Sequence, residues 1–79
     1  MEQKQLEEQI LEIVRQEKTI PEHIDLSAPL ADAGIDSLDA LNILFAIEEK
    51  YGIHIPDDRA RAIRNLDDIV AAVRDQLPQ

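Results

Sequence analysis

Apolar residues recur at helical spacing at both ends of the chain. Near the start they return every three or four positions among polar residues, which predicts an amphipathic helix from about Glu2 to Glu17. The residues of this stripe are Leu6, Ile10, Ile13 and Val14. The closing stretch predicts a helix from Leu66 to Leu77, with Asn65 as its N-cap and acidic residues in its first turn. Its stripe consists of Leu66, Ile69, Val70, Val73 and Leu77.

Prolines and glycines divide the segment between these two helices. Residues 18–35 are expected to form a long connection, because Pro21 and Pro29 lack amide donors and disfavour helix in the residues before them. We expect this connection to pack on the helices through its apolar residues, which are Ile24, Leu26, Leu30 and Ile35. A second helix is expected to start at Asp36–Ser37 and to stop at Tyr51–Gly52, since glycine suits the left-handed position that ends helices.

The remaining segment is short and interrupted. Ile53–Pro56 reads as extended chain, and Pro56 opens a short helical turn that is expected to run from Asp57 to Arg64. The predicted fold is therefore all-α, a small four-helix bundle of three principal helices plus a short third helix, with a long loop between helices one and two. Residues 1–79 are expected to form one domain.

The second predicted helix has two apolar faces at about 100° per residue. The face that suits the core consists of Ala40, Ile43, Leu44, Ile47 and Tyr51. Leu38, Leu41 and Phe45 gather on another side. Either the long loop folds over this second stripe, or the stripe is a partner-docking face with an apolar centre and an acidic rim. In the second case the docking residues are Leu38, Asp39, Leu41, Asn42, Phe45, Glu48 and Glu49.

Composition excludes several classes of function. The 79 residues include no cysteine, so disulfides, thiolate metal sites and a thiol nucleophile are absent. The two histidines, His23 and His54, are far apart and no EF-hand spacing is present, so no metal site is expected; we interpret His54 as structural or solvated. No apolar run reaches membrane-spanning length and the N-terminus does not resemble a signal peptide. We therefore expect a monomeric cytoplasmic protein.

Charge is concentrated around the second helix. Seventeen acidic residues against eight basic ones give a net charge of −9, which opposes nucleic-acid binding. Between Asp32 and Asp58 there are seven acidic residues and one basic residue, Lys50, so this segment carries a net charge of −6. Such a run is often only a solvated face, but here it surrounds the second apolar stripe and favours a partner with a basic surface.

One serine stands at the start of this helix. Asp36 is the better N-cap, which places Ser37 at the first helical position, where backbone amides and the helix dipole favour an added phosphate. The alternative is that Ser37 is itself the N-cap and has no further role.

The residues around this serine resemble a known family. The run Asp32–Leu41 (DAGIDSLDAL) is similar to the attachment motif of acyl carrier proteins, and Ile47–Asp58 (IEEKYGIHIPDD) is similar to that family's following segment. The resemblance implies that Ser37 receives phosphopantetheine from coenzyme A, with Asp36 used in recognition by the phosphopantetheinyl transferase. It also implies a chain without catalytic residues, which carries acyl groups as thioesters to loading and biosynthetic enzymes with basic docking patches, in fatty-acid, lipid or polyketide-type biosynthesis.

Two features depart from the fatty-acid members of this family. Asn42 stands where many of them have an acidic residue, and the predicted third helix carries Arg59, Arg61 and Arg64 where they are usually acidic. These departures favour a specialised pathway. Two alternatives stay open at this point, namely an aminoacyl or peptidyl carrier protein and an acidic helical interaction module without a prosthetic group.

Overall fold

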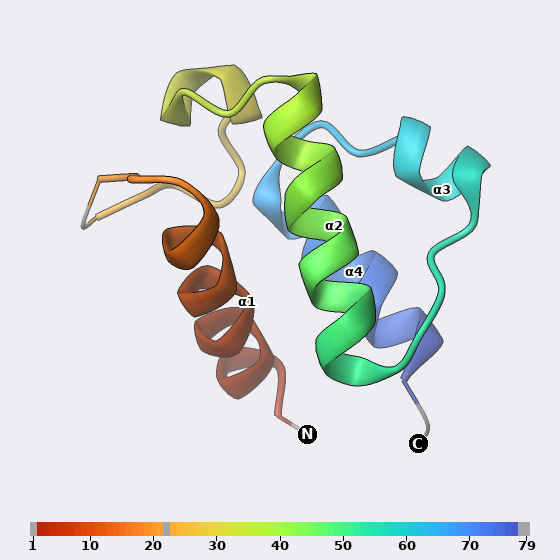
Figure 1. Ribbon diagram of the computed structural model, residues 1–79. Helices are drawn as coiled ribbons and strands as arrows, with labels where there is room; N and C mark the ends of the chain where they lie inside the picture. Colours follow the sequence, from red (N-terminus) through yellow and green to blue (C-terminus); the bar gives the residue numbers. More distant parts are fainter. Residues whose placement is uncertain (1, 22, 78–79) are drawn as a thin grey trace.

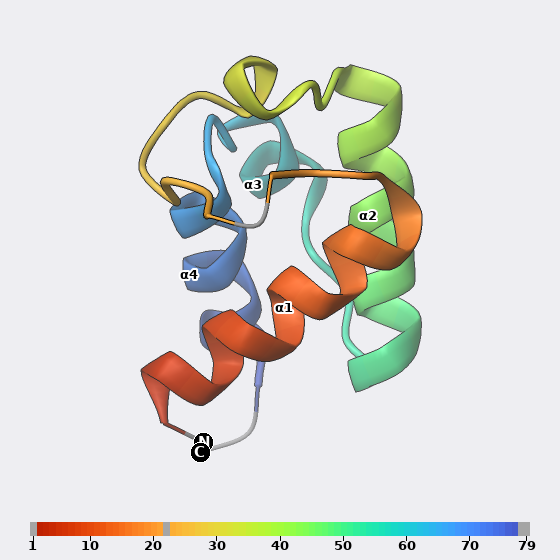
Figure 2. The same ribbon diagram turned by 90° about the vertical axis from the view of Figure 1, so that its left-hand side faces the viewer.

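The structure, a computed structural model, describes residues 2–21 and 23–77. These residues form four α-helices and one 3-10 helix, in the chain order α1 Gln3–Glu17, η1 Leu30–Ala33, α2 Ser37–Tyr51, α3 Asp57–Arg61 and α4 Leu66–Gln76 (Figure 1). The helices α1, α2 and α4 pack around one core, and the short α3 lies at the side of α2 (Figures 1 and 2). The predicted all-α bundle of three principal helices and a short third helix is confirmed. No helix in the described part of the chain is long and apolar enough to cross a membrane.

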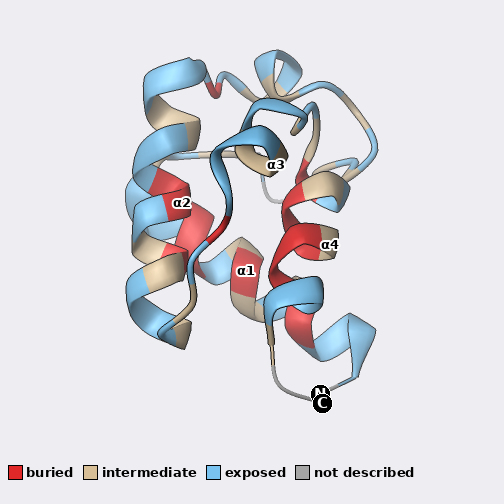
Figure 3. Ribbon diagram, turned by 90° about the vertical axis from the view of Figure 1, so that its right-hand side faces the viewer, coloured by how far each residue is buried: buried red, intermediate tan, exposed pale blue. Residues whose placement is uncertain are grey.

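The core is built from the apolar stripes that the sequence predicts. Its buried residues are Leu6, Ile10, Ile13, Val14, Ile35, Ile43, Leu44, Ile47, Ile55, Leu66, Ile69, Val70, Ala72 and Val73. Each long helix turns its buried residues inward and leaves its other sides exposed (Figure 3). Burial of these aliphatic side chains is the main favourable term that holds the helices together.

The long connection is fastened to the junction between α3 and α4. The Leu30 amide donates a hydrogen bond to the Arg64 carbonyl at 3.0 Å, and the Asp67 amide donates to the Leu26 carbonyl at 3.0 Å. Ile35 is buried in the core, as expected. The 3-10 helix η1 was not predicted from the sequence; it lies between Pro29 and a left-handed Gly34.

Two predicted helix ends need correction. The third helix ends at Arg61 and does not reach Arg64, because the Arg64 amide donates to the Asp68 carboxylate at 2.8 Å instead of to a helical carbonyl. The last helix ends at Gln76, and Leu77 is its half-buried C-cap. The first helix begins at Gln3, with Glu2 at the N-cap position.

Candidate functional site

The start of α2 is held by a reciprocal pair of hydrogen bonds. The Asp36 carboxylate accepts from the Asp39 amide at 2.8 Å, and the Asp39 carboxylate accepts from the Asp36 amide at 3.3 Å. This arrangement is a capping box, which satisfies amides that the first turn of a helix leaves without partners. The prediction that Asp36 caps the helix is confirmed, and the alternative that Ser37 is the cap is wrong.

Ser37 is the first residue of α2 and is exposed. Its hydroxyl has no hydrogen-bond partner among residues 2–21 and 23–77. An exposed hydroxyl at the first turn of a helix is accessible to an enzyme, and the local field there favours an attached phosphate. The geometry therefore permits a phosphodiester on Ser37 without the loss of a structural contact.

A lysine from the end of α1 reaches the same capping box. Lys18 Nζ lies 2.6 Å from Asp39 Oδ2 and joins α1 to the first turn of α2. The hydrogen bond from Lys18 lowers the pKa of the Asp39 carboxyl, and the same bond raises the pKa of Lys18. Asp39, which the sequence placed on the docking face, is thus already paired within the chain. Only the folded arrangement brings these two residues together, so periodicity gave no signal for the pair.

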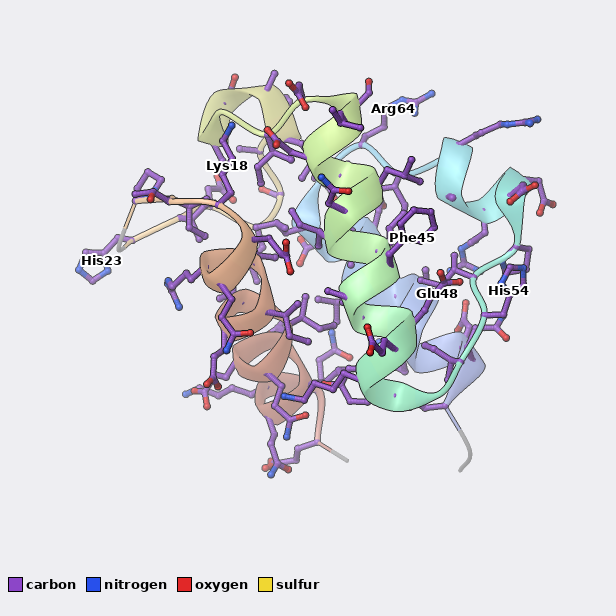
Figure 4. The ribbon with its side chains drawn as sticks, in the orientation of Figure 1. Lys18, His23, Phe45, Glu48, His54 and Arg64 are labelled. Carbon is purple, nitrogen blue, oxygen red and sulfur yellow. The ribbon has the colours of Figure 1, made fainter. Side chains whose placement is uncertain are left out.

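The second apolar stripe of α2 is exposed. Leu38, Leu41 and Phe45 have exposed fractions of 66%, 44% and 56%. Figure 4 shows Phe45 projecting from the middle of α2 on the side of α3. The alternative that the long loop covers this stripe is wrong. Asn42 and Glu49, which flank the stripe, are also exposed.

Glu48 has a role that the sequence analysis did not anticipate. Its side chain is only 19% exposed, and Oε2 accepts a hydrogen bond from the Ile55 amide at 2.7 Å. The same oxygen lies 3.1 Å from His54 Nδ1, while the His54 side chain is itself 81% exposed (Figure 4). Glu48 thus fastens the extended segment before α3 to α2 and is less accessible to a partner than Glu49.

A groove opens beside Ser37, between α2 and the segment that contains α3. Its volume is about 510 Å³. The groove is lined by Pro29, Leu30, Ala31, Ile35, Asp36, Ser37, Ala40, Leu41, Leu44, Ala60, Arg61, Ile63 and Arg64. Most of this lining is apolar, and two arginines supply positive charge. The serine and the arginines were predicted separately from the sequence, and only the fold shows that Ser37, Arg61 and Arg64 line one groove.

Comparisons with known proteins agree with this geometry. A family model described as "Phosphopantetheine attachment site" matches residues 8–73. An acyl carrier protein homolog of Ureaplasma parvum is 35% identical over 68 residues, which cover 86% of this chain and 88% of that protein. An acyl carrier protein of Helicobacter acinonychis is 48% identical over 44 residues, 56% of each chain. The crystal structure of an acyl carrier protein from Thermotoga maritima superimposes with a TM-score of 0.84 at 25% identity, over 96% of this chain and 91% of that one.

Proposed function

Because the chain belongs to the acyl carrier protein family, whose members are non-catalytic carriers with a phosphopantetheine attachment site, we propose that Ser37 is the residue that carries this group. The observation that supports the proposal is the exposed Ser37 hydroxyl. This hydroxyl is not needed as a helix cap, because Asp36 is the N-cap of α2. The Ser37 oxygen forms the phosphodiester with the arm of coenzyme A, and the nucleotide portion of coenzyme A leaves. The chain has no cysteine and therefore no thiol of its own. The arm supplies the thiol that carries acyl groups as thioesters.

The residues around Ser37 suit an arm of this kind. The groove beside the serine has apolar walls from Leu41, Leu44 and Ile63, against which methylene and methyl groups can pack. Polar and charged residues also line the groove, namely Asp36, Ser37, Arg61 and Arg64, and these can face the amides and phosphate of an arm. The residues present therefore fit the group that the family carries.

The exposed stripe Leu38, Leu41 and Phe45 supports a docking role. Contiguous exposed apolar residues with a charged rim mark interaction sites on small proteins. Asp36 and Glu49 supply exposed negative charge beside the stripe, and the net charge of −9 favours enzymes with basic docking patches. We propose that the phosphopantetheinyl transferase and the acyl-loading enzymes use this face, with Asp36 contributing to recognition by the transferase.

A pair of serine variants tests the attachment. Ser37→Ala is expected to abolish the mass increase that follows incubation with coenzyme A and a broad-specificity transferase. Ser27→Ala is the matched control, because Ser27 is the other serine of the chain and its hydroxyl donates to Asp25 at 2.6 Å in the long loop. Both variants should keep their helical circular dichroism. Modification that persists in Ser37→Ala would overturn the assignment.

We further propose that the protein serves a specialised biosynthetic pathway. Asn42 and Arg61 are exposed and reduce the negative charge of the surface that α2 and α3 present. Arg59 contributes less to this effect, because its guanidinium lies 2.6 Å from the Asp75 carboxylate.

We therefore expect fatty-acid elongation enzymes to use the holo protein slowly, and the double variant Asn42→Glu, Arg61→Glu to be used faster. The test compares the steady-state rates of one elongation enzyme with the holo wild type and with the double variant. Arg74→Glu on α4 is the charge control. A wild-type rate equal to that of a standard fatty-acid carrier would show that these two residues are ordinary surface variation.

A further inference from the structure

The backbone of Arg64 is fixed beside the start of α2. Its amide donates to Asp68 Oδ2 at 2.8 Å, and its carbonyl accepts from the Leu30 amide at 3.0 Å. The Leu30 carbonyl in turn accepts from the Ile35 amide at 3.1 Å, two residues before Ser37. Figure 4 shows Arg64 at the same end of α2 as this junction. The arginine is therefore held by hydrogen bonds next to the segment that leads into the attachment residue.

Arg64 lines the same groove as Ser37 and is exposed. Its Nη1 donates to the Arg61 carbonyl at 2.8 Å and to the Ile63 carbonyl at 3.3 Å. Within the described residues these bonds use one of the three guanidinium nitrogens, so Nε and Nη2 keep donors for another acceptor. Two such donors on a planar group match the oxygens of a phosphate.

Negative charge near Ser37 favours a positively charged side chain beside it. A phosphodiester on Ser37 adds negative charge next to Asp36, which is exposed. Lys18 is already paired with Asp39 at 2.6 Å. The positive charges that line the groove with Ser37 are those of Arg61 and Arg64, and Arg64 is the one whose backbone is bonded to the loop that leads into α2.

On the basis of the attachment at Ser37 proposed above, we propose that Arg64 binds the phosphate of the arm and thereby holds the arm over the groove between α2 and α3. Arg64 is a positioning residue, since it acts on where the thiol rests and not on the chemistry of loading. A partner enzyme that takes the thiol into its own active site must then displace this contact. A purely structural role, in which Arg64 only binds the carbonyls after α3, predicts no effect on the arm.

The arm's thiol offers a direct measurement, because the chain has no cysteine of its own. A nitroxide attached to that thiol broadens the amide NMR signals of the groove residues when the arm lies over them. We expect Arg64→Gln to reduce the population of the docked arm by about two- to fivefold, the range that exposed ion pairs supply. Arg64→Lys keeps the charge without the planar fork and should restore part of the effect. Arg74→Gln is the control, because its guanidinium donates to Gln3 at 2.7 Å, on α1.

The outcomes separate this inference from the proposed function. Failure of wild type to gain phosphopantetheine at Ser37 would overturn the proposed function itself. Equal broadening in modified wild type and Arg64→Gln, or equal loss in Arg74→Gln, would overturn the role of Arg64 and leave the attachment intact. A salt titration of the wild-type protein gives a readout that does not depend on the folding of any variant. Broadening of the groove signals should fall as salt rises, together with a change in the ³¹P chemical shift of the phosphodiester, and no salt dependence would contradict the contact.

Discussion

The two apolar faces of α2 have similar residues and opposite environments. Ile43, Leu44 and Ile47 are at most 6% exposed, whereas Leu38, Leu41 and Phe45 are at least 44% exposed. Hydrophobicity alone does not distinguish these faces, because both consist of large aliphatic or aromatic side chains. The difference lies in what the rest of the chain can cover. Folding requires the first face, and the second is available for partners.

The arrangement of the other elements explains why only one face is covered. The helices α1 and α4 pack on the inner side of α2 (Figures 1 and 3). The long loop, which could have covered the outer stripe, is bonded instead to the junction between α3 and α4 through Leu26 and Leu30. The exposed stripe is thus a consequence of where the loop is fastened.

The largest loss of stability is expected on the buried face of α2, called here the inner face, which includes Ile43, Leu44 and Ile47. Ile47→Ala removes a side chain with no exposed area, and truncations of this kind lower the free energy of unfolding by about 2 to 5 kcal/mol. Urea denaturation followed by circular dichroism measures the loss. If Ile47→Ala does not fold, Ile47→Val should fold and cost about 0.5 to 1.5 kcal/mol. A cost near zero for both variants would show that the inner face is not required for folding.

A smaller effect on stability is expected at the N-terminus of α2, where Asp36 is the N-cap. Asp36→Ala removes the carboxylate that accepts from the Asp39 amide, and the loss of an N-cap typically costs about 1 kcal/mol of stability. Asp36→Asn keeps the acceptor and removes the charge, so it should retain stability but be modified more slowly by the transferase. Denaturation and initial modification rates of the two variants separate capping from recognition. Equal modification rates in Asp36→Asn and wild type would show that the charge of Asp36 is not recognised.

The smallest effect on stability is expected on the exposed stripe of α2, called here the outer face, which consists of Leu38, Leu41 and Phe45. Leu41→Ala and Phe45→Ala alter exposed side chains, and surface changes of this kind are usually within about 0.5 kcal/mol. Both should nevertheless slow modification by the transferase, because apolar residues at the centre of an interface carry much of the binding energy. Phe45 does not line the groove beside Ser37, so its variant tests docking alone. A loss of stability as large as that of Ile47→Ala would show that the outer stripe belongs to the core.

Local sequence signals predict the helices well where a residue type has one physical role. Asp36 and Asn65 were predicted as N-caps because their side chains accept hydrogen bonds from amides of the first turn, and both do so in the structure. Gly52 was predicted to end α2 and has φ of 65°, in the left-handed region that favours glycine. The apolar periodicity likewise located the buried face of each long helix.

The misjudged features depend on contacts between distant segments. The third helix ends before Arg64 because Asp68 and Leu30 take the hydrogen-bonding groups of that residue, and no glycine or proline marks this point. The bond from the Ile55 amide to Glu48 and the pair of Lys18 with Asp39 each join α2 to a residue outside that helix, so the periodicity of a single helix does not indicate them. The groove beside Ser37 has the same origin, since its walls come from separate parts of the chain.

The capping box at the start of α2 also affects how the protein behaves when it cannot be loaded. Because Asp36 and Asp39 hold the helix end between them, a chain with alanine at position 37 keeps the fold and the exposed stripe of α2. With the attachment residue and the docking face proposed above, such a chain would occupy the transferase and the biosynthetic enzymes without delivering a substrate. When produced beside the wild-type protein, it would therefore act as a competitive inhibitor of the pathway rather than as an inert, unfolded by-product.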